Sequence, residues 1–166
     1  MSRQPKINRI SPLSADEAKW TELRKIEWTD QACTVILLQY RPPVEAFCVE
    51  FPAGLIDEGE SPEQAAIREL KEETGYEGKV VDVSPTIVAD PGLTNANMQM
   101  VTVEVELGEG DELPEQHLDE GENIERLVVP LSDLYSKLKE LSKEENKIVD
   151  ARLYHWALGL HWSKNL

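Results

Sequence analysis

The chain has 166 residues, and its 17 basic and 32 acidic side chains give a formal net charge of -15 at pH 7. This length suits one domain with a continuous hydrophobic core. The negative charge disfavours general binding to nucleic acids or to anionic membranes. On so acidic a surface, a ligand that carries phosphates would need a cation beside it.

The N-terminal segment contains basic residues but no apolar core, so it does not resemble a secretory signal peptide. The longest apolar runs, such as residues 35–38, are strand-sized and too short to span a bilayer. We therefore expect a cytoplasmic protein, with the nucleus as an alternative location. Cys33 and Cys48 lie in apolar stretches without the spacing of zinc ligands, and we expect both to be reduced and buried.

The first predicted elements are a short helix and two strands. Residues 14–24 have the pattern of a short helix. Residues 31–40 contain a run of β-favouring residues that Pro42 and Pro43 stop, which predicts a buried strand. Residues 46–51 predict a second strand, after which the chain breaks into a loop.

Residues 61–75 carry the start and stop signals of a helix. Ser61 suits the N-cap, Pro62 the first helical position and Gln64 the capping-box position. Gly75 is the matching stop. A buried stripe is predicted from Ala66, Ile67 and Leu70.

Glu69, Glu72 and Glu73 gather on another face of this helix at spacings of three and four. Like charges at these spacings cost about 0.2–0.5 kcal/mol per pair, so helix stability alone does not favour them. Hard divalent cations prefer oxygen ligands, and magnesium commonly joins one or two carboxylates to substrate phosphates. Without further context, such a run is more often a solvated helix face than a metal site.

The rest of the chain alternates strands with amphipathic helices. Residues 98–107 alternate apolar and polar side chains, which predicts a half-buried strand. Residues 108–123 are acidic and predict a mobile loop, and residues 124–129 predict another strand. Two helical stripes are predicted from Leu131, Leu134, Leu138 and Leu141 and from Val149, Leu153, Trp156, Ala157 and Leu160. This order predicts an α/β or α+β domain with helices packed on a mixed sheet.

The acidic helix belongs to a longer pattern of fixed spacing. Gly54 is followed after five residues by Glu60 and, after seven more, by Arg-Glu-Leu-Lys-Glu-Glu-Thr-Gly-Tyr at 68–76. The pattern resembles the Nudix box, Gly-x5-Glu-x7-Arg-Glu-U-x-Glu-Glu-x-Gly-U, in which U is bulky and apolar. Every fixed position is filled, and Tyr76 stands where an aliphatic residue is commoner. The resemblance implies the Nudix fold, an α/β fold with a mixed β-sheet sandwiched between α-helices.

Four flanking segments, 39–43, 50–57, 90–93 and 149–152, resemble the ADP-ribose and ADP-sugar pyrophosphatase branch of the Nudix hydrolases. The likeness covers roughly residues 34–160. It implies magnesium-dependent hydrolysis, with Mn2+ as a substitute, of the pyrophosphate of ADP-ribose or a related ADP-sugar. The products of ADP-ribose would be AMP and ribose 5-phosphate.

The resemblance also implies a metal site. Glu69 and Glu73 would be the principal ligands, the carbonyl of Ala53 a further ligand, and Glu72 an additional or alternating one. Arg68 would orient the carboxylates, which is compatible with a simple ion pair between Arg68 and Glu72.

Catalytic and substrate-binding residues follow in the same way. Glu122 matches the distal glutamate that activates water in this branch, with its neighbours Asp119 and Glu120 as alternatives. Arg41 would reach a substrate phosphate. The alternative is an exposed arginine at a strand end. The remaining candidate substrate contacts are Trp20 and Trp28, for stacking on adenine, and Glu50, Asp90 and Gly92.

The chain departs from the branch near its N-terminus. Members normally carry more chain between the region of Trp20 and the strand ending at Tyr40, including a small sheet that forms their homodimer. We therefore assign residues 1–31 to a shortened N-terminal segment and residues 32–166 to the Nudix hydrolase domain, and the family's homodimer is in doubt here. A catalytically impaired ADP-ribose-binding or regulatory variant, or a hydrolase of another nucleoside diphosphate derivative, remains an alternative. A calcium module is disfavoured because the EF-hand spacing is missing.

Overall fold

The computed structural model describes residues 6–12, 24–29, 32–106 and 113–163. Contacts divide the chain into two compact units, Met1–Ala32 and Cys33–Leu166. In the first unit, β1 (Lys6–Pro12) and β2 (Arg24–Thr29) form an antiparallel hairpin. Apart from Arg24, which begins β2, the predicted helix at 14–24 lies outside the described residues.

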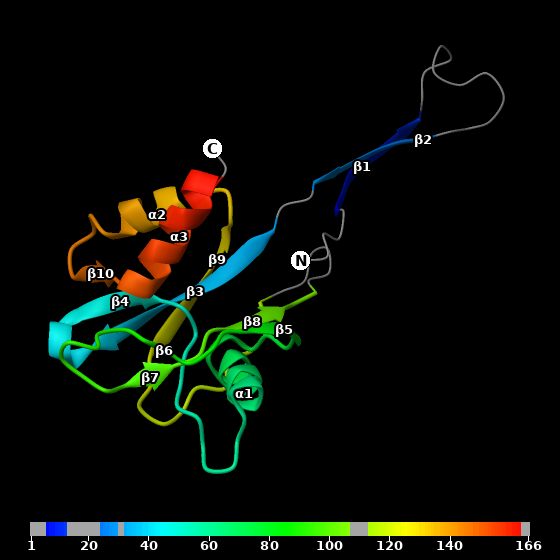
Figure 1. Ribbon diagram of the computed structural model, residues 1–166. Coiled ribbons are helices and arrows are strands. Elements are labelled where there is room, and N and C mark those ends of the chain that lie inside the picture. Colours follow the sequence, from blue (N-terminus) through cyan, green and yellow to red (C-terminus); the bar gives the residue numbers. More distant parts are fainter. Residues whose placement is uncertain (1–5, 13–23, 30–31, 107–112, 164–166) are drawn as a thin grey trace. The chain divides into compact units, whose positions relative to one another are not determined.

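The second unit is built on a four-stranded mixed sheet (Figure 1). Its strands are β3 (Cys33–Arg41), β4 (Ala46–Glu50), β9 (Ile124–Pro130) and β10 (Lys147–Val149), in the order β10-β4-β3-β9. β10 runs parallel to β4, whereas β3 is antiparallel to both β4 and β9. The strands predicted at 31–40, 46–51 and 124–129 are thus confirmed, with small shifts of their ends. A short 3-10 helix, η1 (Pro42–Val44), begins at the predicted prolines.

One face of the sheet carries the main hydrophobic core. Because successive side chains of a strand point to opposite faces, Ile36 and Leu38 of β3 and Val49 of β4 share this face. They pack against α2 (Leu134–Leu141) and α3 (Ala151–Ser163). The buried residues of the cluster are Ile36, Leu38, Val49, Val129, Leu134, Leu138, Leu141, Leu153 and Ala157.

The C-terminal stripes predicted from sequence are confirmed only in part. Leu134, Leu138 and Leu141 are buried in α2, as predicted. Val149, however, lies in β10, because the chain forms three parallel pairs with β4 before α3 begins. In the described part of the chain, no helix is both long and apolar enough to cross a membrane.

The opposite face of the sheet lies toward α1 (Pro62–Thr74) (Figure 1). Beside α1 lie β5 (Lys79–Val83) and β8 (Val101–Glu104), which pair antiparallel, and a short hairpin of β6 (Ile87–Val88) and β7 (Asn97–Met98) completes this side. The strand predicted at 98–107 is therefore shorter, and its four residues in β8 are all half-buried. A mixed sheet between helices, the predicted α/β architecture, is confirmed.

The two cysteines differ in exposure. Cys48 is buried, as predicted. Cys33 is exposed, so the prediction of a buried thiol is wrong there. Cys33 is the first residue of β3, and the end of a strand receives less cover than its centre.

The ends of α1 follow the local signals of the sequence. The Ser61 hydroxyl accepts the Gln64 N–H at 3.3 Å, and the Gln64 side chain accepts the Ser61 N–H at 2.8 Å. Gly75 ends the helix with a φ of 74°, a left-handed conformation that glycine adopts at little cost. A Cβ at Gly75 would also collide with the carbonyl oxygen of Glu115.

We predict that Gly75→Ala destabilises the protein more than Gly59→Ala. Both glycines have positive φ, so each alanine costs roughly 1–2 kcal/mol of backbone strain. Only Gly75 also faces a backbone collision, since a Cβ at Gly59 meets nothing within 4 Å. Urea denaturation of the two variants measures the difference, and equal losses of unfolding free energy would contradict the close approach of Glu115 to α1.

Candidate active site

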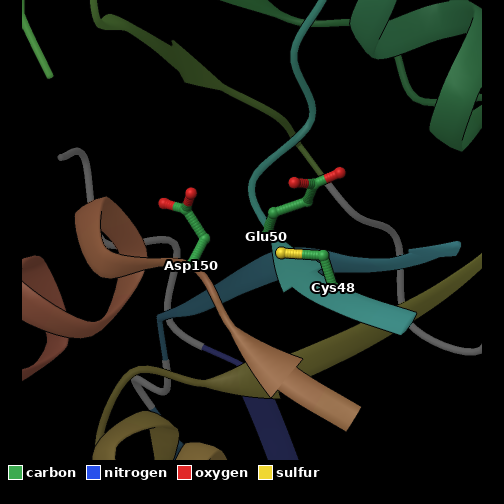
Figure 2. A group of neighbouring side chains, drawn as sticks. All are labelled: Cys48, Glu50 and Asp150. Carbon is green, nitrogen blue, oxygen red and sulfur yellow. The ribbon is translucent and has the colours of Figure 1, made fainter. Parts of the chain in front are cut away.

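Three side chains meet where β4 ends and α3 begins. Cys48, Glu50 and Asp150 place their ligand atoms within 4.8 Å of one another (Figure 2). Glu50 also accepts a hydrogen bond from Arg41 Nε at 2.9 Å and lies 2.6 Å from Arg41 Nη2. Asp150 pairs with Arg152 through Nε at 2.9 Å and Nη2 at 2.6 Å. Two neighbouring ion pairs therefore form a polar group at this end of the sheet.

The thiol of Cys48 is protonated at neutral pH in this group. Burial, followed by the charge of Glu50, raises the pKa of Cys48 to about 12. Because the thiolate rather than the thiol binds metals, a metal ion would have to displace this proton. Cys48, Glu50 and Asp150 form a polar group at the end of the sheet. The guanidiniums of Arg41 and Arg152, which pair with its two carboxylates, are partly exposed.

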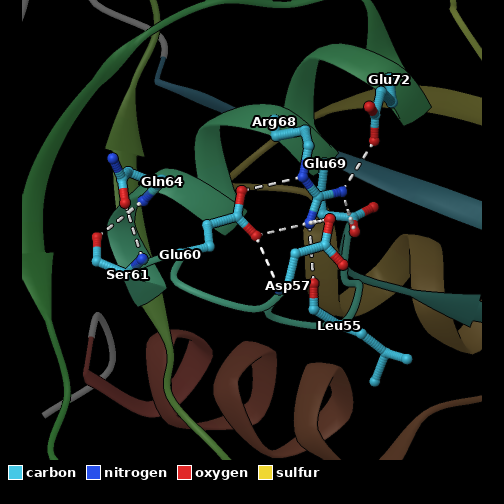
Figure 3. A network of polar contacts seen from close by, with 8 residues as sticks. All are labelled: Leu55, Asp57, Glu60, Ser61, Gln64, Arg68, Glu69 and Glu72. Carbon is cyan, nitrogen blue, oxygen red and sulfur yellow. Dashed lines mark hydrogen bonds and ion pairs between the residues drawn. The ribbon is translucent and has the colours of Figure 1, made fainter.

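Arg68 is the centre of a second network, on α1 (Figure 3). Its Nε and Nη2 donate to the two carboxylate oxygens of Glu60 at 3.0 and 2.9 Å. Its Nη1 donates to Glu69 at 2.7 Å and to Glu72 at 3.1 Å. Nη2 also donates to the carbonyl of Leu55 at 2.9 Å. One guanidinium therefore joins the loop before α1 to two carboxylates of the helix.

Glu60 received no role from sequence reasoning, although it fills a fixed position of the motif. It meets Arg68 with both oxygens, and one of them also accepts the Asp57 N–H at 3.0 Å. The hydrogen bond from Arg68 lowers the pKa of Glu60, so this carboxylate stays charged. The fixed spacing of eight residues between Glu60 and Arg68 was the only sequence signal for this pair. It does not predict a contact by itself, because the contact depends on how the loop before α1 folds.

Glu73 is buried, with 3% of its surface exposed, and has no arginine partner among the described residues. One of its oxygens accepts the Ala53 N–H at 2.9 Å. Burial raises the pKa of Glu73 to about 8, and the nearby charges of Glu69, Glu122 and Glu50 add to the effect. The site therefore holds a carboxylate whose charge is poorly compensated by the protein alone.

Glu69 lies against Gly54, the neighbour of Ala53. A Cβ at Gly54 would overlap the carboxylate of Glu69, so the missing side chain is what admits that carboxylate. Burial raises the pKa of Glu69, against the opposing effect of Arg68. The backbone of residues 53–54 thus contacts the carboxylates of both Glu69 and Glu73.

Glu122, in the described part of the acidic loop, acts electrostatically on these carboxylates. After burial, its charge is among the causes that raise the pKa of both Glu69 and Glu73. Its own carboxylate accepts the N–H of Asp119 at 3.1 Å. The charge of Glu122 therefore acts on both carboxylates of α1.

In the acidic loop, residues 115–117 contact the end of α1, whereas residues 119–123 are exposed. The N–H of His117 donates to the carbonyl of Glu72 at 2.8 Å, and the side chain of Gln116 donates to the carbonyl of Glu73 at 2.6 Å. The sequence predicted a mobile loop because its composition is acidic. The structure shows that the described part of this loop has specific partners on the helix.

The remaining predicted substrate residues are not gathered at the carboxylates of α1. Asp90 and Gly92 are exposed in the loop between β6 and β7, and in the described part of the chain neither makes a hydrogen bond to α1. Trp20 lies outside the described residues, and of Trp28 only the backbone, in β2, is described.

Comparison with known proteins places this site in a family. The family model described as NUDIX domain matches residues 16–154. The chain therefore belongs to the NUDIX domain family. The pattern at residues 54–76, which resembles the Nudix box, lies in α1 and in the loop before it.

Three curated relatives are similar over most of this chain. An uncharacterised Nudix hydrolase of Schizosaccharomyces pombe is 38% identical over 194 residues, covering 96% of this chain and 94% of the relative. An ADP-sugar pyrophosphatase of Mus musculus is 43% identical and an ADP-ribose pyrophosphatase of Saccharomyces cerevisiae 44% identical, covering 77% and 84% of this chain. The chain spans only 59% and 61% of these two proteins. The first alignment is longer than the chain itself, so part of that relative has no counterpart here.

We predict that Glu73 makes the metal-free protein less stable as the pH rises. Because the pKa of Glu73 is raised from 4.5 to about 8 in the folded state, its contribution to stability is full below 4.5 and is lost as the pH rises through about 8. In the presence of a chelator, the unfolding free energy of the wild type should therefore fall relative to that of Glu73→Gln as the pH rises from about 5 to about 8. Urea denaturation across this range is the measurement.

Glu77→Gln is the matched control, because Lys71 lowers the pKa of this exposed glutamate instead of raising it. Its stability relative to the wild type should not rise over the same window. A constant difference between Glu73→Gln and the wild type would show that Glu73 ionises normally.

Proposed function

We propose that the protein hydrolyses the pyrophosphate of ADP-ribose or a related ADP-sugar in a magnesium-dependent reaction that gives AMP and, from ADP-ribose, ribose 5-phosphate. The observation that carries the proposal is the convergence of Glu69, Glu73 and the 53–54 backbone, with Glu122 nearby. The names of the mouse and yeast relatives support the substrate class.

The residues present fit a divalent cation. Glu69 and Glu73 are hard oxygen ligands, and neither is fully neutralised by protein groups. We propose that both bind Mg2+, with Mn2+ as a substitute, together with the carbonyl of Ala53 and with Glu72 as an additional ligand. Bound there, the cation would neutralise phosphate oxygens and stabilise charge on the leaving phosphate. It also explains how a protein of net charge -15 can bind an anionic substrate.

The protein's own groups would position the reaction. Arg68 holds the carboxylates of Glu69 and Glu72 through hydrogen bonds from one nitrogen. Glu122 would accept a proton from the attacking water, whose oxygen forms the new bond to phosphorus as the bridging P–O bond breaks. Glu122 lies on an exposed loop, which suits a group that must meet both solvent water and substrate.

The polar group at the end of β4 provides the proposed substrate contacts. Arg41 is partly exposed while its partner Glu50 is buried, so the guanidinium can face a phosphate without losing its ion pair. Glu50 would then accept a hydrogen bond from a substrate hydroxyl. Asp90 and Gly92 are proposed as further contacts, and Trp20 and Trp28 as candidates for stacking on adenine.

We further propose that residues 1–31 form a shortened N-terminal segment and that residues 32–166 form the catalytic domain, with a cytoplasmic location. The boundary between the two compact units, after Ala32, supports this division. The family match, however, already begins at residue 16. A binding variant with impaired catalysis is the rival function, because the N-terminal segment expected to clamp adenine is short.

We predict that Glu69→Gln and Glu73→Gln each lower kcat/KM for ADP-ribose by about a hundredfold or more, because each removes a proposed metal ligand. AMP release at saturating Mg2+ is the measurement. Glu77→Gln, which changes an exposed glutamate beyond the helix, should keep wild-type activity. A wild-type protein as silent as Glu69→Gln toward ADP-ribose, ADP-mannose and other nucleoside diphosphate derivatives would leave the binding variant as the better explanation.

We predict that Arg41→Gln raises KM by about tenfold with a smaller change in kcat, since a guanidinium that binds substrate and transition state alike contributes mainly to affinity. The KM of Arg41→Lys should lie between those of the wild type and Arg41→Gln, because an ammonium keeps the charge but not the bidentate geometry of a guanidinium. Steady-state kinetics with ADP-ribose measures both values. If KM stays at the wild-type value in Arg41→Gln, the arginine serves only its ion pair with Glu50.

A further inference from the structure

Gln116 is a loop residue that no sequence motif singles out. Its side-chain Nε2 donates to the carbonyl of Glu73 at 2.6 Å and to the carbonyl of Ile124 at 3.1 Å. One amide thus joins the last turn of α1 to the first residue of β9. We propose that Gln116 is a positioning residue that fixes the loop of Glu122 against the metal helix, an inference that rests on the proposed function.

The bond from Gln116 to Ile124 closes the loop that contains Glu122. Inside it, the N–H of Glu122 donates to the carbonyl of Asp119 at 3.0 Å, and the N–H of Asp119 donates to the carboxylate of Glu122 at 3.1 Å. Gly121 permits this turn with a φ of 94°. Glu122 is therefore held by a tight turn only two residues before the point where Gln116 pins the chain.

The same amide reaches the proposed metal ligand itself. The last carbonyls of a helix have no partner within the helix, so they are available to groups from elsewhere in the fold. Gln116 takes the carbonyl of Glu73, and the side chain of Arg126, two residues into β9, takes that of Thr74. The carboxylate of Glu73 faces the metal site while its carbonyl holds the loop of the proposed base. A shift of the loop relative to α1 therefore changes the separation between base and metal.

A purely structural role would be the alternative for Gln116. In that role the amide would only satisfy two buried carbonyls, and its loss would lower stability without acting through Glu122. The two roles differ in one measurable way, because a positioning residue has nothing left to position once the base has been removed.

The test uses Gln116→Met, which keeps the length of the side chain and removes both donors. We expect kcat for ADP-ribose to fall about tenfold or more and KM to stay within about twofold, because a small misplacement of a catalytic group acts on the chemical step. Gln99→Met is the matched control, since Gln99 also donates to a backbone carbonyl, that of Ser84 at 3.1 Å, and should keep wild-type kcat.

When Gln116→Met is added to Glu122→Gln, the further fall in kcat should be less than about twofold. Fully additive losses, or an unchanged kcat in Gln116→Met, would overturn the proposal. Titration with Mn2+ should give unchanged affinity in Gln116→Met, which shows that α1 is folded, and loss of that affinity would instead indicate the structural role.

Hydrogen exchange separates this proposal from the proposed function. In Gln116→Met the amides of residues 117–123 should exchange faster, while those in the first turns of α1 keep their wild-type rates. If the wild type hydrolyses no nucleoside diphosphate derivative, the proposed function fails, and exchange still shows whether Gln116 fixes the loop. Unchanged exchange of residues 117–123 would refute the inference even in an active enzyme.

Discussion

The guanidinium of Arg68 holds together the carboxylates of the candidate site and the loop before α1. It meets Glu60 with two of its nitrogens and shares the third between Glu69 and Glu72. Those contacts raise the pKa of Arg68, first through Glu60, so its charge is permanent. Because Glu60 lies before the helix, the same ion pairs that reduce repulsion along α1 also fix the loop whose backbone contacts Glu69 and Glu73.

Glu73 shows what Arg68 leaves unresolved. It is the most buried of these carboxylates, and its described protein partner is a single N–H, that of Ala53. A buried charge without an opposite charge is unfavourable, and the raised pKa expresses that cost. Natural proteins commonly accept such local conflicts at functional sites. A divalent cation between Glu73 and Glu69 would remove the conflict, which is why the electrostatics and the family assignment support the same chemistry.

The four-stranded sheet positions residues of the site on the face directed to α1. Ile36, Leu38 and Val49 bind its one face to α2 and α3, so the alternate residues are directed to the face of α1. On that face Leu37 pairs with Glu50 of β4 on one side and with Arg126 of β9 on the other. The paired residues Glu50, Leu37 and Arg126 therefore direct Glu50, the partner of Arg41, toward the face of α1, and Arg126 reaches the end of that helix.

The features that depend on local geometry are those that the sequence predicts correctly. The capping signals and Gly75 define α1, and spacings of three and four place Glu69, Glu72 and Glu73 together, because both follow from the period of a helix. Local patterns misjudge the exposure of Cys33 and the strand position of Val149, since both depend on neighbours distant in sequence. Two hydrogen bonds depend on long-range packing: Gln116 and Glu73 are 43 residues apart, and Arg126 and Thr74 are 52 residues apart. Periodicity reports which side of an element a residue occupies, whereas the partner on that side is chosen by packing.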